Sequence, residues 1–145
     1  MSNKFGVEKE FTKDGFRCAV IANYGLGHGC GYVEITKDSP LFNVEFDKLD
    51  SIVKVHGGLT YDKISDEYPL ESNSPSRWIG FDCNHLYDAK DIDLIYKSED
   101  PVLINIYRNR PIHPNQKVRT IEFVERQLIK LVDQLKGGKE DAINV

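Results

Sequence analysis

Near the C-terminus, the apolar residues of this chain recur with the period of an α-helix. They follow one another at alternating steps of three and four residues, at Ile121, Val124, Leu128, Leu131 and Leu135. This spacing places all of them on one stripe of a helix and leaves the charged residues on the other side. The stripe spans fewer than three heptads, which favours packing on a sheet over a dimer seam. We expect this helix to end at Gly137 and Gly138, because glycine is a common helix terminator.

Upstream of this helix, short apolar segments alternate with turn signals, which is typical of strands. In residues 11–22, Asp14-Gly15 separates two apolar runs and predicts a hairpin, because both turn positions can adopt positive φ. Further strands are expected at residues 32–36, 52–56, 59–63 and 77–83. These elements predict an α+β fold: an antiparallel or mixed sheet of five to six strands, with one long C-terminal helix packed on it and long loops.

Three regions give weaker signals. Residues 24–31 contain four glycines in eight positions and predict a loop. Phe46 and Leu49 indicate one or two turns of amphipathic helix. Residues 84–115 contain three prolines, which exclude a continuous helix, and residues 102–107 within them could form a strand or a buried edge segment. A loop of this length inside a compact domain is often functional.

The length and composition are those of a small globular protein. The 145 residues predict one domain, residues 1–138, followed by a flexible tail at residues 139–145. No run of eighteen apolar residues occurs, and the N-terminus lacks the apolar core of a signal peptide. The three cysteines are an odd number, which favours a reducing cytoplasm over a disulfide scaffold. We therefore expect a cytoplasmic protein that contacts no membrane.

Charge is distributed unevenly along the chain. The first 100 residues hold 11 Lys and Arg against 18 Asp and Glu, whereas residues 101–119 hold four basic residues and no acidic one. The acidic body argues against nucleic-acid binding, which needs a broad basic face. The basic segment could hold one compact anion such as a phosphate group, with Arg108, Arg110 and His113 as donors. It could equally be a solvated loop.

Two short segments contain most of the side chains that can bind a ligand or catalyse a reaction. In the first, residues 55–61, His56 precedes Gly57 and Gly58, which would let a ligand or a second strand approach the main chain. His56 could act as a base, as a metal ligand or as a hydrogen-bond donor to phosphate. It could also be a structural histidine that satisfies loop carbonyl groups. Thr60 belongs to the same candidate site.

The second segment, residues 78–88, places Asp82, His85 and Asp88 at successive steps of three. If the chain turned helical after Phe81, all three side chains would lie on one face. They could coordinate a divalent cation such as manganese, iron or zinc, or form a hydrogen-bond web that fixes a loop. Asp82 could instead cap a turn. Because this spacing is far less specific than paired Cys-x-x-Cys motifs, we assign no metal and no cofactor to it.

We expect different roles for one cysteine and one tryptophan of the second segment. Cys83 is expected to be a buried, inert thiol rather than a nucleophile. Aromatic residues in strands usually belong to the core, but Trp78 lies beside Arg77 at a loop edge. This pair is therefore the best candidate for stacking on a flat ligand such as a purine.

An ordered set of motifs in this chain resembles a family of small uncharacterised phage and prophage proteins. The motifs are GHGCGYV at residues 27–33, VHGGLTY at residues 55–61 and GFDCNH at residues 80–85, followed by Asp88. The segment IEFVE at residues 121–125 and two later Gln-Leu pairs also fit, so the resemblance spans roughly residues 27–136. The family usually has tryptophan in place of Gly29 and small residues in place of Leu86 and Tyr87, which implies a pocket of altered shape.

The resemblance implies a role in the conflict between phages and bacteria. Small oligomeric phage proteins of this kind include anti-Thoeris and anti-CBASS counter-defence factors, which sequester nucleotide immune signals. Sequestin and Lockin act in this way, on signals such as the cyclic or conjugated ADP-ribose products of bacterial TIR enzymes. Other phage proteins cleave cyclic dinucleotides.

The residues and the resemblance together favour a non-enzymatic homo-oligomer, a dimer or higher, which sequesters a small nucleotide-type ligand in the cytoplasm of an infected bacterial host. The expected ligand-binding residues are His56, Gly57, Thr60, Arg77, Trp78, Asp82, His85, Asp88, Arg108 and Arg110. The alternative is a hydrolase such as a phosphodiesterase, with His56 or His85 as general base and with Asp82 or Asp88 orienting this base or binding a metal. A third possibility is a protein-binding inhibitor or a structural phage protein in which these motifs only brace loops.

Overall fold

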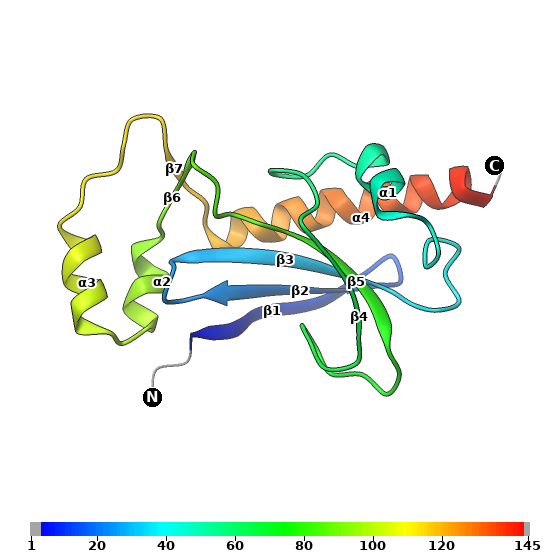
Figure 1. The fold of residues 1–145 in the computed structure, drawn as a ribbon, viewed down its shortest axis with the longest axis horizontal. Coiled ribbons are helices and arrows are strands. Elements are labelled where there is room, and N and C mark those ends of the chain that lie inside the picture. Colours follow the sequence, from blue (N-terminus) through cyan, green and yellow to red (C-terminus); the bar gives the residue numbers. More distant parts are fainter. Residues whose placement is uncertain (1–3, 144–145) are drawn as a thin grey trace.

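The computed structural model describes residues 4–143 and has two layers, a five-stranded antiparallel sheet and a long helix on one face of it (Figure 1). The sheet order is β1-β2-β3-β5-β4. The strands are β1 Phe5–Lys13, β2 Phe16–Asn23, β3 His28–Ile35, β4 Tyr61–Ser65 and β5 Ser76–Asp82. The helix is α4, Ile121–Ile143, and it packs on β1, β2 and β3. The expected α+β fold is therefore confirmed.

The hairpin between β1 and β2 follows from the chemistry of its turn. Asp14 and Gly15 both take positive φ, 51° and 83°, which the tight turn requires. Lys13 and Phe16 pair directly across this turn. The predicted hairpin is therefore confirmed, and its first strand extends back to Phe5.

The main hydrophobic core lies between the sheet and α4. Four residues of the predicted helical stripe are fully buried there: Val124, Leu128, Leu131 and Leu135. They face alternate residues of the strands, as the two-residue period of a strand requires. The layers approach closely at Gly31 in β3, where a Cβ would lie 2.6 Å from Phe81 Cε1 and 2.9 Å from Leu128 Cγ. The absence of a side chain at this position therefore sets how near α4 lies to the sheet.

Replacing Gly31 with Ala is expected to lower the free energy of unfolding by about 1–3 kcal/mol, the usual cost of overfilling a packed core. The added methyl group would overlap the ring of Phe81, which is itself buried. Urea unfolding followed by circular dichroism measures the change. Gly25→Ala is the matched control, because a Cβ there would meet no atom nearer than Asn23 Oδ1 at 3.8 Å. Equal effects of the two substitutions would contradict the close packing at Gly31.

The glycine-rich stretch at residues 24–31 is only partly a loop. β3 already begins at His28, so the expectation of a loop throughout this stretch is wrong. Within the strand, the missing side chain of Gly29 makes room for α4, because a Cβ there would lie 3.0 Å from Val124 Cγ2. Of the glycines in this stretch, only Gly27 takes positive φ, 69°.

The expected strand at residues 52–56 is also wrong. Helix α1, Phe46–Ile52, confirms the predicted amphipathic turns and ends where the strand was expected to begin. The chain after it is extended, but Gln134 of α4 takes the place of a neighbouring strand. Its side chain accepts a hydrogen bond from the Lys54 amide at 2.6 Å and donates one to the Lys54 carbonyl oxygen at 2.8 Å. The backbone is thus satisfied without entering the sheet.

Residues 84–115 contain more regular structure than their sequence indicates. The elements are β6 Asp88–Ala89, α2 Ile92–Lys97 and α3 Pro101–Arg108, and β6 pairs in parallel with β7 Lys117–Val118. The expectation of a strand or edge segment at residues 102–107 is wrong, because these residues belong to α3. Asp100 caps this helix by accepting hydrogen bonds from the Val102 and Leu103 amides. Pro101 lies in the first turn, where its missing N–H costs nothing, so this proline begins a helix.

Helix α4 continues through Gly137 and Gly138 to Ile143, so the expected stop at these glycines is wrong. Glycine typically ends a helix by adopting a left-handed conformation. In the described part of the chain, the glycines with positive φ are Gly15, Gly27, Gly57 and Gly58. Residues 139–143 of the expected tail therefore continue the helix, while residues 144 and 145 lie outside the described residues.

Candidate functional site

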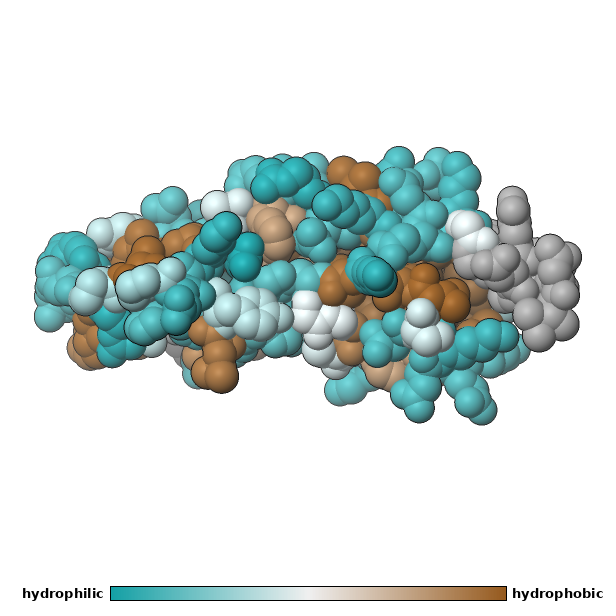
Figure 2. Space-filling model, turned by 90° about the horizontal axis from the view of Figure 1, so that it is seen from above, coloured by the Kyte–Doolittle hydropathy of each residue, from teal (hydrophilic) through white to brown (hydrophobic). Residues whose placement is uncertain are grey.

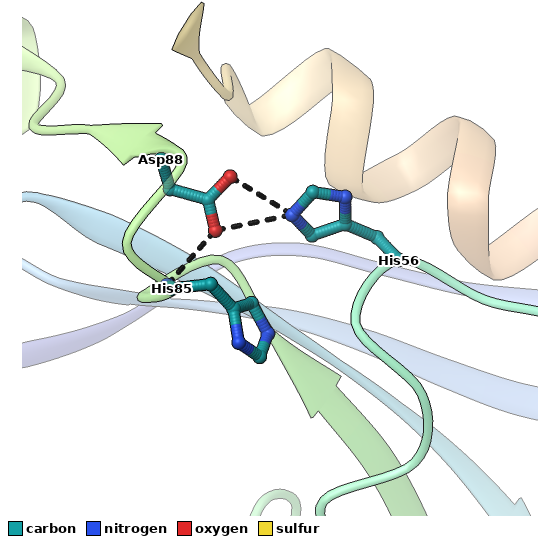
Figure 3. Close-up of side chains that lie close together, drawn as sticks. All are labelled: His56, His85 and Asp88. Atoms are coloured by element: carbon teal, nitrogen blue, oxygen red, sulfur yellow. Dashed lines mark hydrogen bonds and ion pairs between the residues drawn. The ribbon is translucent and has the colours of Figure 1, made fainter. Parts of the chain in front are cut away.

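Two segments that are far apart in the sequence, the chain after α1 and the connection from β5 to β6, bring His56 together with His85 and Asp88, and we call these residues the His/Asp cluster (Figure 3). His56 follows α1, His85 lies in the loop after β5, and Asp88 begins β6. One nitrogen or oxygen atom from each side chain lies within 4.8 Å of the other two. Three of the side chains that were singled out in the sequence therefore meet at one place.

The Asp88 carboxylate is the centre of the His/Asp cluster, and its side chain is only 1% exposed. Its Oδ1 accepts hydrogen bonds from His56 Nε2 at 2.9 Å and Arg119 Nε at 3.0 Å, and its Oδ2 accepts one from the His85 amide at 3.0 Å. Burial alone would raise the pKa of Asp88, but the hydrogen bonds from these three donors outweigh it and lower the pKa. The carboxylate is therefore ionised at neutral pH.

The ring and the main chain of His56 are both held in place. Its amide donates to Gln127 Oε1 at 3.0 Å, which ties the loop to α4. The ring meets Phe123 and Tyr87 edge-on, with ring centroids 5.2 and 5.3 Å away, and the side chain is 9% exposed. A shielded imidazole held by an ionised carboxylate can serve as a general base or as a metal ligand.

Gly57 provides the space that His85 occupies. Gly57 has a φ of 71°, in the left-handed region that favours glycine, and a Cβ at this position would lie 2.1 Å from His85 Nε2. The His85 ring stacks on Tyr87 with an interplanar angle of 12°. Its Nε2 is buried and has no hydrogen-bond partner among the described residues, although Asp82 Oδ1 lies 3.5 Å away. A ligand or a second strand was expected to approach the main chain here, and the imidazole of His85 occupies this place.

Asp82 lies outside the His/Asp cluster, so its expected grouping with His85 and Asp88 on one helical face is wrong. The chain is not helical after Phe81: β5 ends at Asp82, and a bend follows. Asp82 caps this bend by accepting a hydrogen bond from the Asn84 amide at 3.0 Å, which is the capping role considered for it. It also accepts one from Thr60 Oγ1 at 3.1 Å.

Arg77 and Trp78 belong to the interior rather than to a ligand site. The Trp78 side chain is 0% exposed and lies in a second apolar cluster of the sheet, so it offers no stacking surface. Arg77 is buried as well, and it pairs with Asp62 through two hydrogen bonds of 2.8 and 2.9 Å. Its Nη1 also donates to carbonyl oxygens in the segment before α1, including that of Leu41 at 3.1 Å. The expectation that this pair meets a ligand at a loop edge is therefore wrong.

Arg108 and Arg110 line a cavity of about 400 Å³, which we call the arginine cavity. It lies between α2, α3, β6 and the loop before β7, and Asp88, Tyr96 and Tyr107 also line it. The Arg110 guanidinium lies 4.9 Å from the centroid of the Tyr107 ring. Two of the predicted phosphate donors thus share a cavity with aromatic rings and with the central residue of the His/Asp cluster.

A second cavity of about 310 Å³ is lined by Thr60, Asp82, His28 and Cys30 among others. No role was expected for His28, whose Nδ1 is buried without a hydrogen-bond partner in the described chain. Burial, and then the charge of Lys90, lower the pKa of His28. The histidine could have been noticed in the sequence, because it lies inside the GHGCGYV motif.

Cys83 is buried, and burial raises the pKa of its thiol well above the ordinary value. The expectation that this thiol is buried is therefore confirmed. Sequence reasoning missed Arg119, Phe123 and Gln127 as parts of the site, although all three hold His56 or Asp88 in position. Only the position of Arg119 within the basic segment at residues 101–119 hinted at such a role.

Comparison with known proteins adds no assignment. No protein-family model matches the chain, and neither the curated proteins nor the solved structures give a match. Within residues 4–143, no helix is both long enough and apolar enough to cross a membrane.

Proposed function

We propose that this protein is phage-encoded and binds a small nucleotide-type ligand without converting it. It would thereby sequester a nucleotide-derived immune signal of the cyclic or conjugated ADP-ribose type and block bacterial antiviral defence. The observation that carries the proposal is the arginine cavity, which combines two guanidinium groups with two tyrosine rings. Its volume of about 400 Å³ falls in the usual range for small-molecule sites.

The lining of the arginine cavity matches the two chemical parts of a nucleotide. Arg108 and Arg110 carry planar, permanently charged groups that bind phosphate oxygens in pairs. Tyr96 and Tyr107 provide flat apolar faces on which a base can stack. Asp88 also lines this cavity, and its hydrogen bond with His56 joins the cavity to the His/Asp cluster.

Apolar side chains at the surface support the homo-oligomer that belongs to this proposal. Three of them are exposed around the arginine cavity and α3: Val102, Ile106 and Ile112. Figure 2 shows hydrophobic residues exposed among hydrophilic ones at the end of the molecule where α3 lies. A second copy that covered this end would bury these residues and enclose a ligand more completely.

The His56–Asp88 pair favours a second candidate function, a hydrolase that cleaves such a ligand. A buried carboxylate that orients an imidazole is a common general-base arrangement. In this case His56 would accept a proton from the attacking water, and Arg108 or Arg110 would stabilise charge on a phosphate. The two functions differ in whether the ligand is recovered unchanged.

Mass spectrometry of captured ligand distinguishes these functions. The purified protein is incubated with a panel of cyclic dinucleotides and ADP-ribose derivatives, filtered, and heated to release whatever has bound. Recovery of an intact compound supports sequestration, whereas the appearance of a cleaved product supports the hydrolase. If no compound is retained or cleaved, both functions are contradicted and a protein partner becomes the better explanation.

A further inference from the structure

We propose that the His/Asp cluster binds a divalent transition-metal cation, with His56, His85 and Asp88 as its three protein ligands and zinc as the ion that suits them best. The proposal does not depend on ligand binding in the arginine cavity. Two imidazoles and one carboxylate form a recurrent donor set for zinc, in which a water or a substrate completes the coordination.

The distances in the cluster are close to those that a bound cation requires. Zinc–ligand bonds of about 2.0–2.1 Å in a tetrahedral site place the ligand atoms roughly 3.3 Å apart. His56 Nε2 lies 2.9 and 3.1 Å from the two Asp88 oxygens. The ligand atom of His85 lies within 4.8 Å of the ligand atoms of both other residues.

The buried Nε2 of His85 points to a missing partner. It has no hydrogen bond among the described residues, and a polar atom left in this state normally costs free energy. A cation that the ring turns to bind would remove this cost. The ring has this position only because residue 57 is glycine, since a Cβ there would lie 2.1 Å from Nε2.

The hydrogen bonds of Asp88 are compatible with a cation that replaces its contact with His56. Without the His56 bonds, Oδ1 would still accept from Arg119 Nε and Oδ2 from the His85 amide. Each oxygen would then have one lone pair free to bind the ion. The two remaining donors would orient the carboxylate, as outer hydrogen bonds do in metal sites.

The surroundings are also favourable in polarity. Asp88 and the nearby Asp82 carry two negative charges, and Arg119 and Lys90 carry two positive charges that act on Asp88. The Arg119 guanidinium lies 5.0 Å from the centroid of the Phe123 ring. Phe123 and Tyr87 form an aromatic wall beside His56, which shields one side of the site from water.

Zinc binding to the full-length protein tests this proposal. The protein is dialysed against a chelator and then against buffer, zinc chloride is added, and bound zinc is measured by mass spectrometry after gel filtration. One equivalent is expected, with affinity determined by competition with a coloured chelator. His85→Gln and His56→Gln should each weaken binding at least about tenfold. His113→Gln is the matched control, because His113 is an exposed loop histidine that is not one of the three proposed ligands, and this variant should bind zinc as the unaltered protein does.

Two results would overturn the proposal: no zinc retained by the unaltered protein, or unchanged zinc affinity in His85→Gln. Circular dichroism establishes that each variant is folded. Cobalt(II) gives a measurement that needs no variant. Intense visible absorption, which is characteristic of four- or five-coordinate cobalt, supports the site, whereas the weak spectrum of the hydrated ion would contradict it.

Discussion

Asp88→Ala is expected to lower the free energy of unfolding by about 3 kcal/mol. The substitution removes a buried carboxylate that binds three donors, and it leaves the charge of Arg119 without its partner. Breaking a buried ion pair on one side typically costs about 3–5 kcal/mol, and the partial exposure of Arg119 places the effect at the lower end. The loop at His85 also loses the hydrogen bond that fixes it to β6.

Urea unfolding at neutral pH measures the effect of Asp88→Ala. Asp133→Ala is the control, because Asp133 is an exposed carboxylate on α4 whose contact with Lys13 is long, 3.6 Å. The control should change stability by less than about 0.5 kcal/mol. An Asp88→Ala protein as stable as the control would show that the cluster does not bind the loop to the rest of the fold.

Leu128→Ala is expected to lower the free energy of unfolding by about 3–4 kcal/mol. Leu128 is 0% exposed and lies in the main core, where its side chain faces Gly31 of β3. This loss combines the transfer free energy of the removed isopropyl group with the cost of the cavity that it leaves behind. Backbone glycine on the facing strand cannot extend a side chain into that cavity, so little relaxation is available.

The matched control for this substitution is Leu86→Ala. Leu86 is 95% exposed, so the same chemical change there should alter stability by less than about 0.5 kcal/mol. Both midpoints and slopes of urea unfolding should be compared, because an unchanged slope shows that the difference lies in the native state. A loss below about 1 kcal/mol for Leu128→Ala would contradict the packing of α4 on the sheet.

Periodicity and turn chemistry were sufficient to predict the outline of the fold. The stripe from Val124 to Leu135 depends only on the geometry of a helix, and the Asp14-Gly15 hairpin depends on local backbone preference. The segment at residues 52–56 was predicted wrongly because its apolar pattern is that of an extended chain. Its hydrogen-bond partner is a glutamine 80 positions away in the sequence, and no local pattern shows such a contact.

The sequence predicted which residues belong to the candidate site better than it predicted which of them lie together. His56, Gly57, His85 and Asp88 were all singled out, and the structure brings them together. Asp82 was grouped wrongly because spacing places residues on one face only where the backbone is helical, and the chain there bends instead.

The placement of Trp78 shows a different limit of sequence reasoning. Alternate residues of a strand point to opposite faces, but the sequence does not show whether a second face is covered. Trp78 lies on the face of the sheet away from α4, where Tyr32 and Leu70 cover it. Leu70 belongs to the loop between β4 and β5. The position of this loop over Trp78 is set by the tertiary structure, and the sequence pattern does not show it.

Equilibrium dialysis measures whether ADP-ribose binds in the arginine cavity, as we propose. The unaltered protein should retain ADP-ribose or one of its cyclic derivatives. The double variant Arg108→Ala/Arg110→Ala should lose at least about tenfold in affinity, since charge-assisted hydrogen bonds to phosphate would be removed. Arg126→Ala, an exposed arginine on α4, is the control and should bind as before. Equal binding by the double variant and the control, or no binding by the unaltered protein, would contradict ligand binding in the arginine cavity.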